Sequence, residues 1–312
     1  MSMDYTKIFD PEPVQAFQLR EPAATVKGDV GDRSVYVYSD DIVLAVNVAL
    51  ATGRPLLIRG PSGGGKSSLA LNVARVLKRR FYEKVISSRT QARDLLWEVD
   101  HLRRLQDAQT RTLKPDFSPY INPGVFWWAF DRQNALKQRN KLAPQVLDQN
   151  ETGENTDVSE SVVLLDEIDK ADPDVPNNLL VPLGSLSFTV DETGEVVSAK
   201  QTPLVFVTTN EERQLPVAFL RRCVELKLKD LNKDDLVKIG RAHFPAADPA
   251  TLQKVAKLIL SQSGAGAPPS AAEYLDTARA CLNLKIDPDD DIWQDLSKIT
   301  VWKHGRTPGR ST

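Results

Sequence analysis

The glycine-rich segment at residues 60–67, Gly-Pro-Ser-Gly-Gly-Gly-Lys-Ser, constrains this chain more than any other feature of its sequence. It follows an apolar run at 55–58 and leads into a helix-forming run at 68–77. A strand, a glycine turn and a helix in this order allow backbone N–H groups to surround phosphate oxygens without interference from a Cβ atom. The N-terminus of the helix adds positive charge. A merely flexible glycine turn would need neither the strand nor the helix, so the segment predicts a phosphate-binding loop.

Two polar side chains at the end of this loop predict the ligand. Lys66 has the reach to contact the β- and γ-phosphates of a nucleotide, and the hydroxyl of Ser67 can ligate Mg²⁺. We therefore expect a nucleotide and Mg²⁺ as ligands. The residues expected to bind the nucleotide are Gly60, Pro61, Ser62, Gly63, Gly64, Gly65, Lys66, Ser67 and Ser68.

The charge balance argues against nucleic-acid binding through an overall basic field. The 312 residues carry 40 Lys and Arg and 42 Asp and Glu, a formal net charge of −2.

The longest apolar stretch, Ile42 to Ala51, is too short to span a bilayer, and the first residues lack a leader pattern. The two cysteines, Cys223 and Cys281, have no metal-site spacing. We expect a cytoplasmic protein with reduced thiols.

Strand and helix patterns alternate as far as residue 228, and the pattern is helical beyond it. Apolar runs predict strands at 55–59, 84–88, 162–165, 203–207 and 224–228, and a hairpin at 187–198. Helical periodicity predicts helices at 42–52, 67–79, 89–106, 131–142, 177–183, 233–242, 249–262, 270–283 and 289–299. The expected fold class is α/β, a three-layer parallel sheet followed by a small helical lid.

The expected domains are an N-terminal arm at 1–35, an α/β nucleotide-binding core at 36–228, a helical lid at 229–300 and a disordered tail at 301–312. Three segments of the core carry further expectations. In the predicted helix 89–106, one apolar face holds Leu95, Leu96, Val99, Leu102 and Leu105. The aromatic residues of 126–130 are interpreted as packed core or a subunit interface in preference to a partner contact. The acidic segment 148–160 reads as a solvated loop.

An acidic pair follows the third predicted strand of the sheet. Asp166 and Glu167 come directly after the apolar run Val162–Leu165. A parallel strand that ends in an acid places the carboxylate at the edge of the sheet where the phosphate loop is also expected. We expect Asp166 to hold Mg²⁺ and Glu167 to orient or deprotonate an attacking water. Taken alone, such a pair is more often a loop start or a helix cap.

Two further elements follow in chain order. Asn210 follows the predicted strand 203–207 in the sequence Thr208-Thr209-Asn210, where its amide can bond both a γ-phosphate and a water. Arg221 and Arg222 can neutralise charge on a transferred phosphoryl group, in the same subunit or from a neighbour. A turn asparagine and two surface arginines are the alternatives.

Together these segments resemble AAA+ ATPases. Gly60–Ser67 resembles Walker A, Leu165–Lys170 resembles Walker B, Thr208–Asn210 resembles sensor 1, and Ala218–Cys223 resembles the arginine-finger segment. The resemblance covers roughly residues 36–285.

Within this group the chain is most similar to the MoxR branch, whose segments between Walker A and Walker B resemble Thr90–Leu96 and Gly124–Phe130. The predicted hairpin 187–198 stands where that branch has an insertion before sensor 1. The resemblance implies the sheet order 5-1-4-3-2 and ATP bound at a subunit interface of a ring, usually a hexamer. It also implies that Arg221 or Arg222, with Arg222 the closer match, faces the neighbouring subunit's γ-phosphate. Partners with von Willebrand A-like domains are implied as well.

One departure from the family concerns sensor 2, an Arg or Lys at the start of a lid helix. Residues 264–278 contain no Arg or Lys, and Arg279 falls about two turns inside the predicted helix. This keeps a second hypothesis open, an ATP-dependent binding switch in a defence or signalling assembly with slow turnover. A DNA-acting motor or loader ranks below it because of the net charge of −2. A P-loop kinase ranks last, because the acid pair and Asn210 suit water activation.

Overall fold

The computed structural model describes residues 5–12, 35–140, 160–262, 270–286 and 292–293. The chain divides into two compact units. The first comprises Met1–Asp10, Ser39–Arg59 and Ala70–Lys227, and the second comprises Pro11–Tyr38, Gly60–Leu69 and Leu228–Thr312. The boundaries of the arm, core, lid and tail stay predictions. The acidic segment 148–159, the tail 301–312 and most of the predicted helix 289–299 lie outside the described residues.

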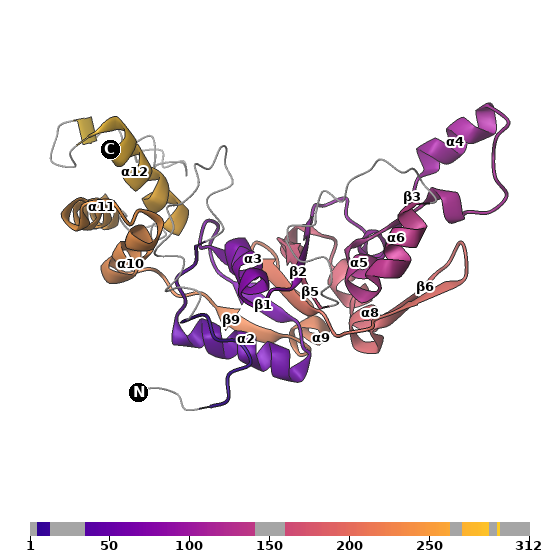
Figure 1. Cartoon of the computed structure of the whole chain (residues 1–312), viewed down its shortest axis with the longest axis horizontal. Coiled ribbons are helices and arrows are strands. Elements are labelled where there is room, and N and C mark those ends of the chain that lie inside the picture. The colour runs from indigo at the N-terminus through magenta and orange to yellow at the C-terminus, as the bar shows by residue number, and fades with distance from the viewer. Residues whose placement is uncertain (1–4, 13–34, 141–159, 263–269, 287–291, 294–312) are drawn as a thin grey trace, which may run out of the picture. The chain divides into compact units, whose positions relative to one another are not determined.

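A five-stranded parallel sheet forms the centre of the first unit (Figure 1). Its strands are β1 (Leu56–Arg59), β2 (Arg80–Val85), β5 (Ser161–Asp166), β8 (Leu204–Thr209) and β9 (Val224–Lys227). They lie in the order β2-β5-β8-β1-β9. Numbered along the chain, this is the predicted order 5-1-4-3-2 read from the other edge. The predicted fold class is therefore confirmed.

Both faces of the sheet are buried, which explains why its strands are continuous apolar runs. Leu57, Val163 and Val205 lie on the face that packs against Phe126 and Trp127. The alternating residues of the same strands are also buried; they include Leu56, Ile58, Val162, Leu164 and Phe206. The sheet is thus the middle layer of three.

The helices of the first unit are short. They are α2 (Asp40–Thr52), α3 (Lys66–Val76, of which Lys66–Leu69 belongs to the second unit), α5 (Val125–Phe130), α6 (Arg132–Asn140), α7 (Asp174–Asn178), α8 (Leu180–Ser185) and α9 (Val217–Leu220). The predicted helices 42–52, 67–79 and 131–142 correspond to α2, α3 and α6, the single predicted helix 177–183 is divided between α7 and α8, and α5 and α9 were not predicted as helices. Helix α2 packs on β1 and β9 and ends at Gly53, whose φ of 65° is the left-handed conformation that glycine adopts without strain. Asn47 of α2 accepts hydrogen bonds from the backbone N–H groups of Ile8 and Phe9, at 2.7 and 2.8 Å.

The aromatic segment 124–130 is core. Phe126, Trp127 and Phe130 on α5 are at most 2% exposed, and the Trp127 ring meets Phe188 edge-on at 5.9 Å between centroids. Phe188 belongs to the predicted hairpin, which the structure confirms as β6 (Ser187–Val190) paired with β7 (Glu195–Ser198). The aromatic side chains therefore join the hairpin to the sheet.

The predicted single helix 89–106 is wrong. The structure has a 3₁₀ turn (Ala92–Leu95), strand β3 (Trp97–Val99) and helix α4 (His101–Gln109). Leu95 is buried, whereas Leu102 and Leu105 are 67% and 57% exposed. Polar caps divide the run, because Asp94 accepts the backbone N–H of Gln91 and Asp100 accepts that of Arg103.

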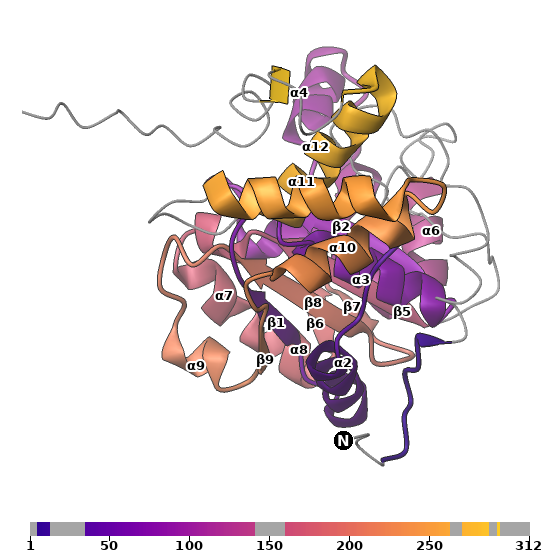
Figure 2. The same cartoon turned by 90° about the vertical axis from the view of Figure 1, so that its left-hand side faces the viewer.

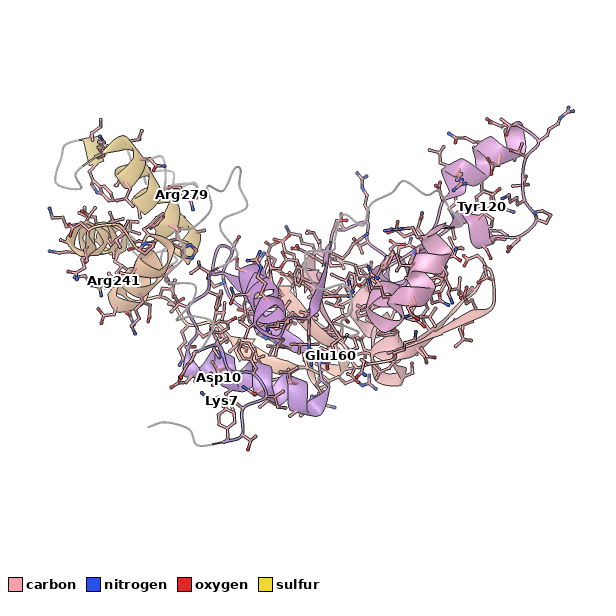
Figure 3. The ribbon with its side chains drawn as sticks, viewed as in Figure 1. Lys7, Asp10, Tyr120, Glu160, Arg241 and Arg279 are labelled. Atoms are coloured by element: carbon pink, nitrogen blue, oxygen red, sulfur yellow. The ribbon has the colours of Figure 1, made fainter. Side chains whose placement is uncertain are left out.

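Strand β3 pairs antiparallel with β4 (Ile121–Pro123), and α4 extends away from the sheet between them (Figure 1). Tyr120, labelled in Figure 3, fixes this extension from its base. Its hydroxyl donates to Asp107 Oδ2 at 2.8 Å and accepts the backbone N–H of Lys114 at 3.2 Å.

The second predicted strand begins four residues earlier than expected. Helix α3 ends at Val76, and Lys78 has a φ of 53°. The N–H of Arg79 bonds the carbonyl of Ala74, and the N–H of Lys78 bonds that of Arg75, which is the Schellman pattern of a helix end. This helix end was not predicted because a lysine, in place of the usual glycine, occupies the left-handed position. Arg80 therefore starts β2 and does not extend the helix.

Three helices form the core of the second unit (Figure 2). They are α10 (Lys233–His243), α11 (Pro249–Gln262) and α12 (Ala271–Leu284), all close to their predicted bounds. Their buried side chains include Leu236, Leu252, Ile259 and Tyr274, and Trp293, beyond α12, belongs to the same buried cluster. Within the described part of the chain, no helix has the length and apolarity to cross a membrane.

Candidate functional site

The glycine-rich loop has the backbone conformation that only glycine supports cheaply. Gly63 and Gly65 have φ values of 74° and 83°. A Cβ atom added at Gly63 would lie 2.8 Å from Ser270 Oγ, and one at Gly64 would lie 3.2 Å from the carbonyl oxygen of Pro61. The loop therefore needs its glycines for conformation and for space. This fits a chain segment that wraps phosphate oxygens with its backbone N–H groups.

Lys66 is held by the loop itself. Its side chain is 6% exposed, and Nζ donates to the carbonyl oxygens of Gly60 and Pro61, both at 2.8 Å. A buried ammonium group this close to the backbone of a glycine turn suits recognition of a phosphate as a point charge. The residues of the loop thus fit the phosphate chain of a nucleotide.

The acid pair is organised by a threonine on the neighbouring strand. Thr208 of β8 donates from Oγ1 to Asp166 Oδ1 at 2.5 Å and accepts the backbone N–H of Glu167 at 2.8 Å. Both acids are partly buried, and Glu167 has φ 61° and ψ 49°. The donors expected for Mg²⁺, the Asp166 carboxylate and the Ser67 hydroxyl, are hard oxygen ligands of the kind that Mg²⁺ prefers.

Both carboxylate oxygens of Glu167 have partners. Asn210 Nδ2 donates to Oε1 at 3.2 Å, and Lys170 Nζ donates to Oε2 at 2.5 Å. The hydrogen bond to Glu167 is the main reason that the pKa of Lys170 is raised above its usual value. The structure therefore brings together three predicted site residues, Asp166, Glu167 and Asn210.

Asp169 connects the same two strand ends and was not expected in a functional role. Its side chain is 3% exposed, and Oδ2 accepts the backbone N–H groups of Asn210 at 3.2 Å and Glu212 at 3.0 Å. These bonds fix the turn that carries Asn210. The signal in the sequence was a second acid two residues after Glu167, but its target could be found only from the pairing of β5 with β8.

The two arginines lie on a separate, anchored segment. Phe219 and Cys223 are buried on either side of Arg221 and Arg222, whose side chains are exposed. Arg54 holds the segment by donating to the carbonyl oxygens of Arg221 and Arg222, the latter at 3.1 Å. The guanidinium groups of both arginines make no hydrogen bond or ion pair with any other described residue. They are therefore presented to solvent on a fixed backbone.

The start of α12 lies against the glycine-rich loop. The backbone N–H of Ala272 donates to the carbonyl oxygen of Gly63 at 3.2 Å. The first turn of the helix contains no basic side chain. Arg279, labelled in Figure 3, is directed elsewhere: its Cζ lies 5.9 Å from the ring centroid of Phe244, and its Nη1 lies 3.6 Å from Asp276. The missing sensor 2 residue is thus not replaced by Arg279.

A protein-family model matches the part of the chain that carries this geometry. Residues 55–223 match the AAA domain, dynein-related subfamily. No curated protein matches the chain. The solved structures that resemble it include a point mutant of RuvB of Thermotoga maritima, at 14% identity and a TM-score of 0.47, covering 83% of this chain and 68% of that one. The RuvB Holliday junction branch migration motor of the same organism gives 15% identity and a TM-score of 0.45, covering 83% and 66%.

The match to the AAA model runs from the residue before β1 to Cys223 and takes in the loop, the acid pair, Asn210 and both arginines. It covers more than half of the chain. Members of this family generally hydrolyse ATP. The chain belongs to the AAA domain family, dynein-related subfamily.

Proposed function

We propose that this chain is a Mg-ATP-hydrolysing ATPase of the MoxR type that remodels or activates a partner protein complex. The observation that carries the proposal is the hydrogen-bonded group of Asp166, Glu167 and Asn210 at the ends of β5 and β8. A carboxylate for Mg²⁺, a carboxylate for water and a neutral amide suit hydrolysis better than transfer to a second substrate.

The roles follow from the chemistry of each side chain. The loop residues Gly60–Ser68 bind the phosphates, Lys66 neutralises their charge, and Ser67 with Asp166 would hold Mg²⁺. Bound Mg²⁺ supplies positive charge to the β- and γ-phosphates. Glu167 accepts the proton of the attacking water, which requires that one carboxylate oxygen exchanges its bond to Asn210 or Lys170 for a bond to water.

The site is completed by an arginine of a neighbouring subunit in a ring, for which a hexamer is the expected form. The support is the fixed backbone of Arg221 and Arg222 together with their exposed side chains. Arg222 is the preferred finger, since it stands directly before the buried Cys223. A von Willebrand A-like client and the MoxR assignment rest on the sequence resemblance, and a cytoplasmic location rests on the composition and the two cysteines.

The start of α12 favours a second candidate function, an ATP-dependent binding switch with slow turnover. No basic residue stands in the first turn of that helix, although the turn lies against the loop at Gly63. A γ-phosphate would then lack one of the charges that usually stabilise its transfer. Turnover that stays slow with every candidate client would favour the switch.

Glu167→Gln tests the proposed reaction. The amide keeps the size of the side chain but cannot accept a proton, so ATP binding should be retained while turnover falls by about 10²-fold or more. Glu98→Gln is the matched control, because Glu98 is exposed on β3 and its carboxylate pairs with Lys84, not with any residue of the Asp166, Glu167 and Asn210 group. Normal turnover by Glu167→Gln, or an equal loss in both variants, contradicts the assigned role of Glu167.

A further inference from the structure

Thr208 is a buried side chain that bonds both acids at the end of β5. Its residue is 0% exposed. The N–H of Glu167 must be the donor in one bond, so the hydroxyl hydrogen is directed to Asp166 Oδ1 in the other. A single hydroxyl therefore fixes a carboxylate of one residue and the backbone of the next.

The backbone of Glu167 needs such a restraint. Its φ of 61° and ψ of 49° lie in the left-handed region, which costs a residue with a Cβ atom about 1–2 kcal/mol. Such conformations persist where the surroundings determine them, and they gather at functional sites. The bond from the Glu167 N–H to Thr208 stabilises this conformation at the peptide group before Glu167, and the backbone N–H of Lys170 bonds the Glu167 carbonyl oxygen at 3.0 Å on the other side. The Thr208 bond is the one that links the Glu167 backbone to the neighbouring strand β8.

Comparison with the next residue on β8, Thr209, shows that the contact of Thr208 with the acid pair is more than packing. Thr209 is also buried, at 1% exposed, but its Oγ1 accepts the backbone N–H of Glu211 at 2.9 Å. Successive side chains of a strand point to opposite faces, so only the hydroxyl of Thr208 faces the acid pair. A buried, β-branched residue would satisfy the strand without a hydroxyl, as Val205 and Val207 do.

We propose that Thr208 is a positioning residue for ATP hydrolysis, which orients the Asp166 carboxylate for Mg²⁺ and sets the direction of the Glu167 side chain. This inference rests on the proposed function. Hydrogen-bond partners of metal-ligating carboxylates typically contribute about 10–100-fold to metal affinity or activity. The hydroxyl should therefore affect the Mg²⁺ requirement and the turnover, and leave Mg²⁺-free nucleotide binding unchanged.

The experiment compares Thr208→Val, which keeps the shape and removes the hydroxyl, with Thr208→Ser, which keeps the hydroxyl. Thr277→Val is the control for the general effect of removing a buried threonine hydroxyl, since Thr277 is 0% exposed and donates to the carbonyl of Glu273 at 2.7 Å on α12. Binding of a fluorescent ATP analogue is measured with and without Mg²⁺, and turnover is measured against Mg²⁺ concentration.

For Thr208→Val we expect turnover about 10–100-fold lower, a higher Mg²⁺ concentration at half-maximal turnover, and weaker analogue binding only when Mg²⁺ is present. Thr208→Ser should return all three values to within a few-fold of wild type. If Thr208→Val does not fold, Thr208→Ala replaces it in the same comparison.

Three results overturn the inference: an unchanged Mg²⁺ dependence in Thr208→Val, an equal loss in the Ser and Val variants, or an equal loss in Thr277→Val. Failure of the proposed function looks different. It appears in the wild-type chain as an absence of Mg²⁺-dependent ATP hydrolysis or as normal turnover by Glu167→Gln, and an absence of Mg-ATP binding would overturn both.

Discussion

At the scale of single residues, buried polar groups determine where the reactive side chains lie. Thr208 and Asp169 are each at most 3% exposed, and together they bond the side chain or backbone of Asp166, Glu167 and Asn210. Buried hydrogen bonds of this kind are costly to leave unmade, so they specify one arrangement. The two strand ends therefore act as one unit.

Burial also determines the reactivity of Cys223, which follows the two exposed arginines. Burial raises the pKa of its thiol to about 12, and Sγ donates to the carbonyl of Phe219 at 3.4 Å. At pH 8 only about one thiol in 10⁴ is then ionised, and the thiolate is the reactive form. Cys281 is also buried.

We therefore expect native protein to react with a thiol reagent far more slowly than denatured protein, in which both cysteines should react. The labelling rate at Cys223 should rise with pH up to about pH 12, because burial raises the pKa of this thiol to about 12 and only the thiolate reacts. The measurement is thiol labelling followed by mass spectrometry at several pH values. Fast labelling of Cys223 in folded protein at pH 8 would show that the segment after Arg222 is not anchored by burial.

At the scale of elements, the division of residues 92–109 gives a direct test of stability. Leu95 is buried at 0% exposure, so Leu95→Ala should lower the free energy of unfolding by about 2–5 kcal/mol. Leu102→Ala and Leu105→Ala should each change it by less than about 0.5 kcal/mol, because both side chains are exposed on α4.

Denaturant unfolding of the three variants measures these differences. The single amphipathic helix predicted from the sequence would instead give similar losses at all three leucines. Comparable destabilisation by Leu102→Ala and Leu95→Ala would therefore support one continuous helix and contradict the observed division.

The elements that the sequence predicted best are those with one local explanation. Strands β5 and β8 are continuous apolar runs because both of their faces are buried, and α12 is marked by the capping box of Ser270 and Glu273. The segment 89–106 misled because leucines at helical spacing also occur where a turn, a strand and a helix follow each other. The end of α3 was predicted too late, because a left-handed residue at a helix end is usually glycine and here it is Lys78.

The site was predictable to the extent that each of its groups can be recognised from the residues directly around it in sequence. The loop, the acid pair and Asn210 each follow a recognisable strand. Thr208, Asp169 and Lys170 were missed as contributors because their partners depend on distances across β5 and β8, and on the left-handed turn at Glu167. The residues next to a predicted catalytic group are the places to look for such partners.

At the scale of the whole molecule, the proposed function depends on more than one copy of the chain. Arg222 is exposed and its side chain makes no hydrogen bond or ion pair with any other residue that the structure describes, and Arg54 fixes its backbone. An arginine finger typically contributes about 10³–10⁵ to the rate of phosphoryl transfer. Arg222→Ala should therefore bind ATP but lose about 10³-fold or more in turnover, with Arg241→Ala, an exposed arginine on α10 (Figure 3), as the control.

Mixing two inactive variants tests whether the arginine acts on a neighbouring subunit. In a ring assembled from equal amounts of Glu167→Gln and Arg222→Ala, about a quarter of the interfaces pair an intact Glu167 with an intact Arg222 of the next subunit. Turnover of the mixture should then rise well above that of either variant alone, and the mass of the ATP-bound assembly should show a ring. A mixture as inactive as its components would contradict a site completed in trans, because an arginine acting within its own subunit cannot be replaced by a neighbour.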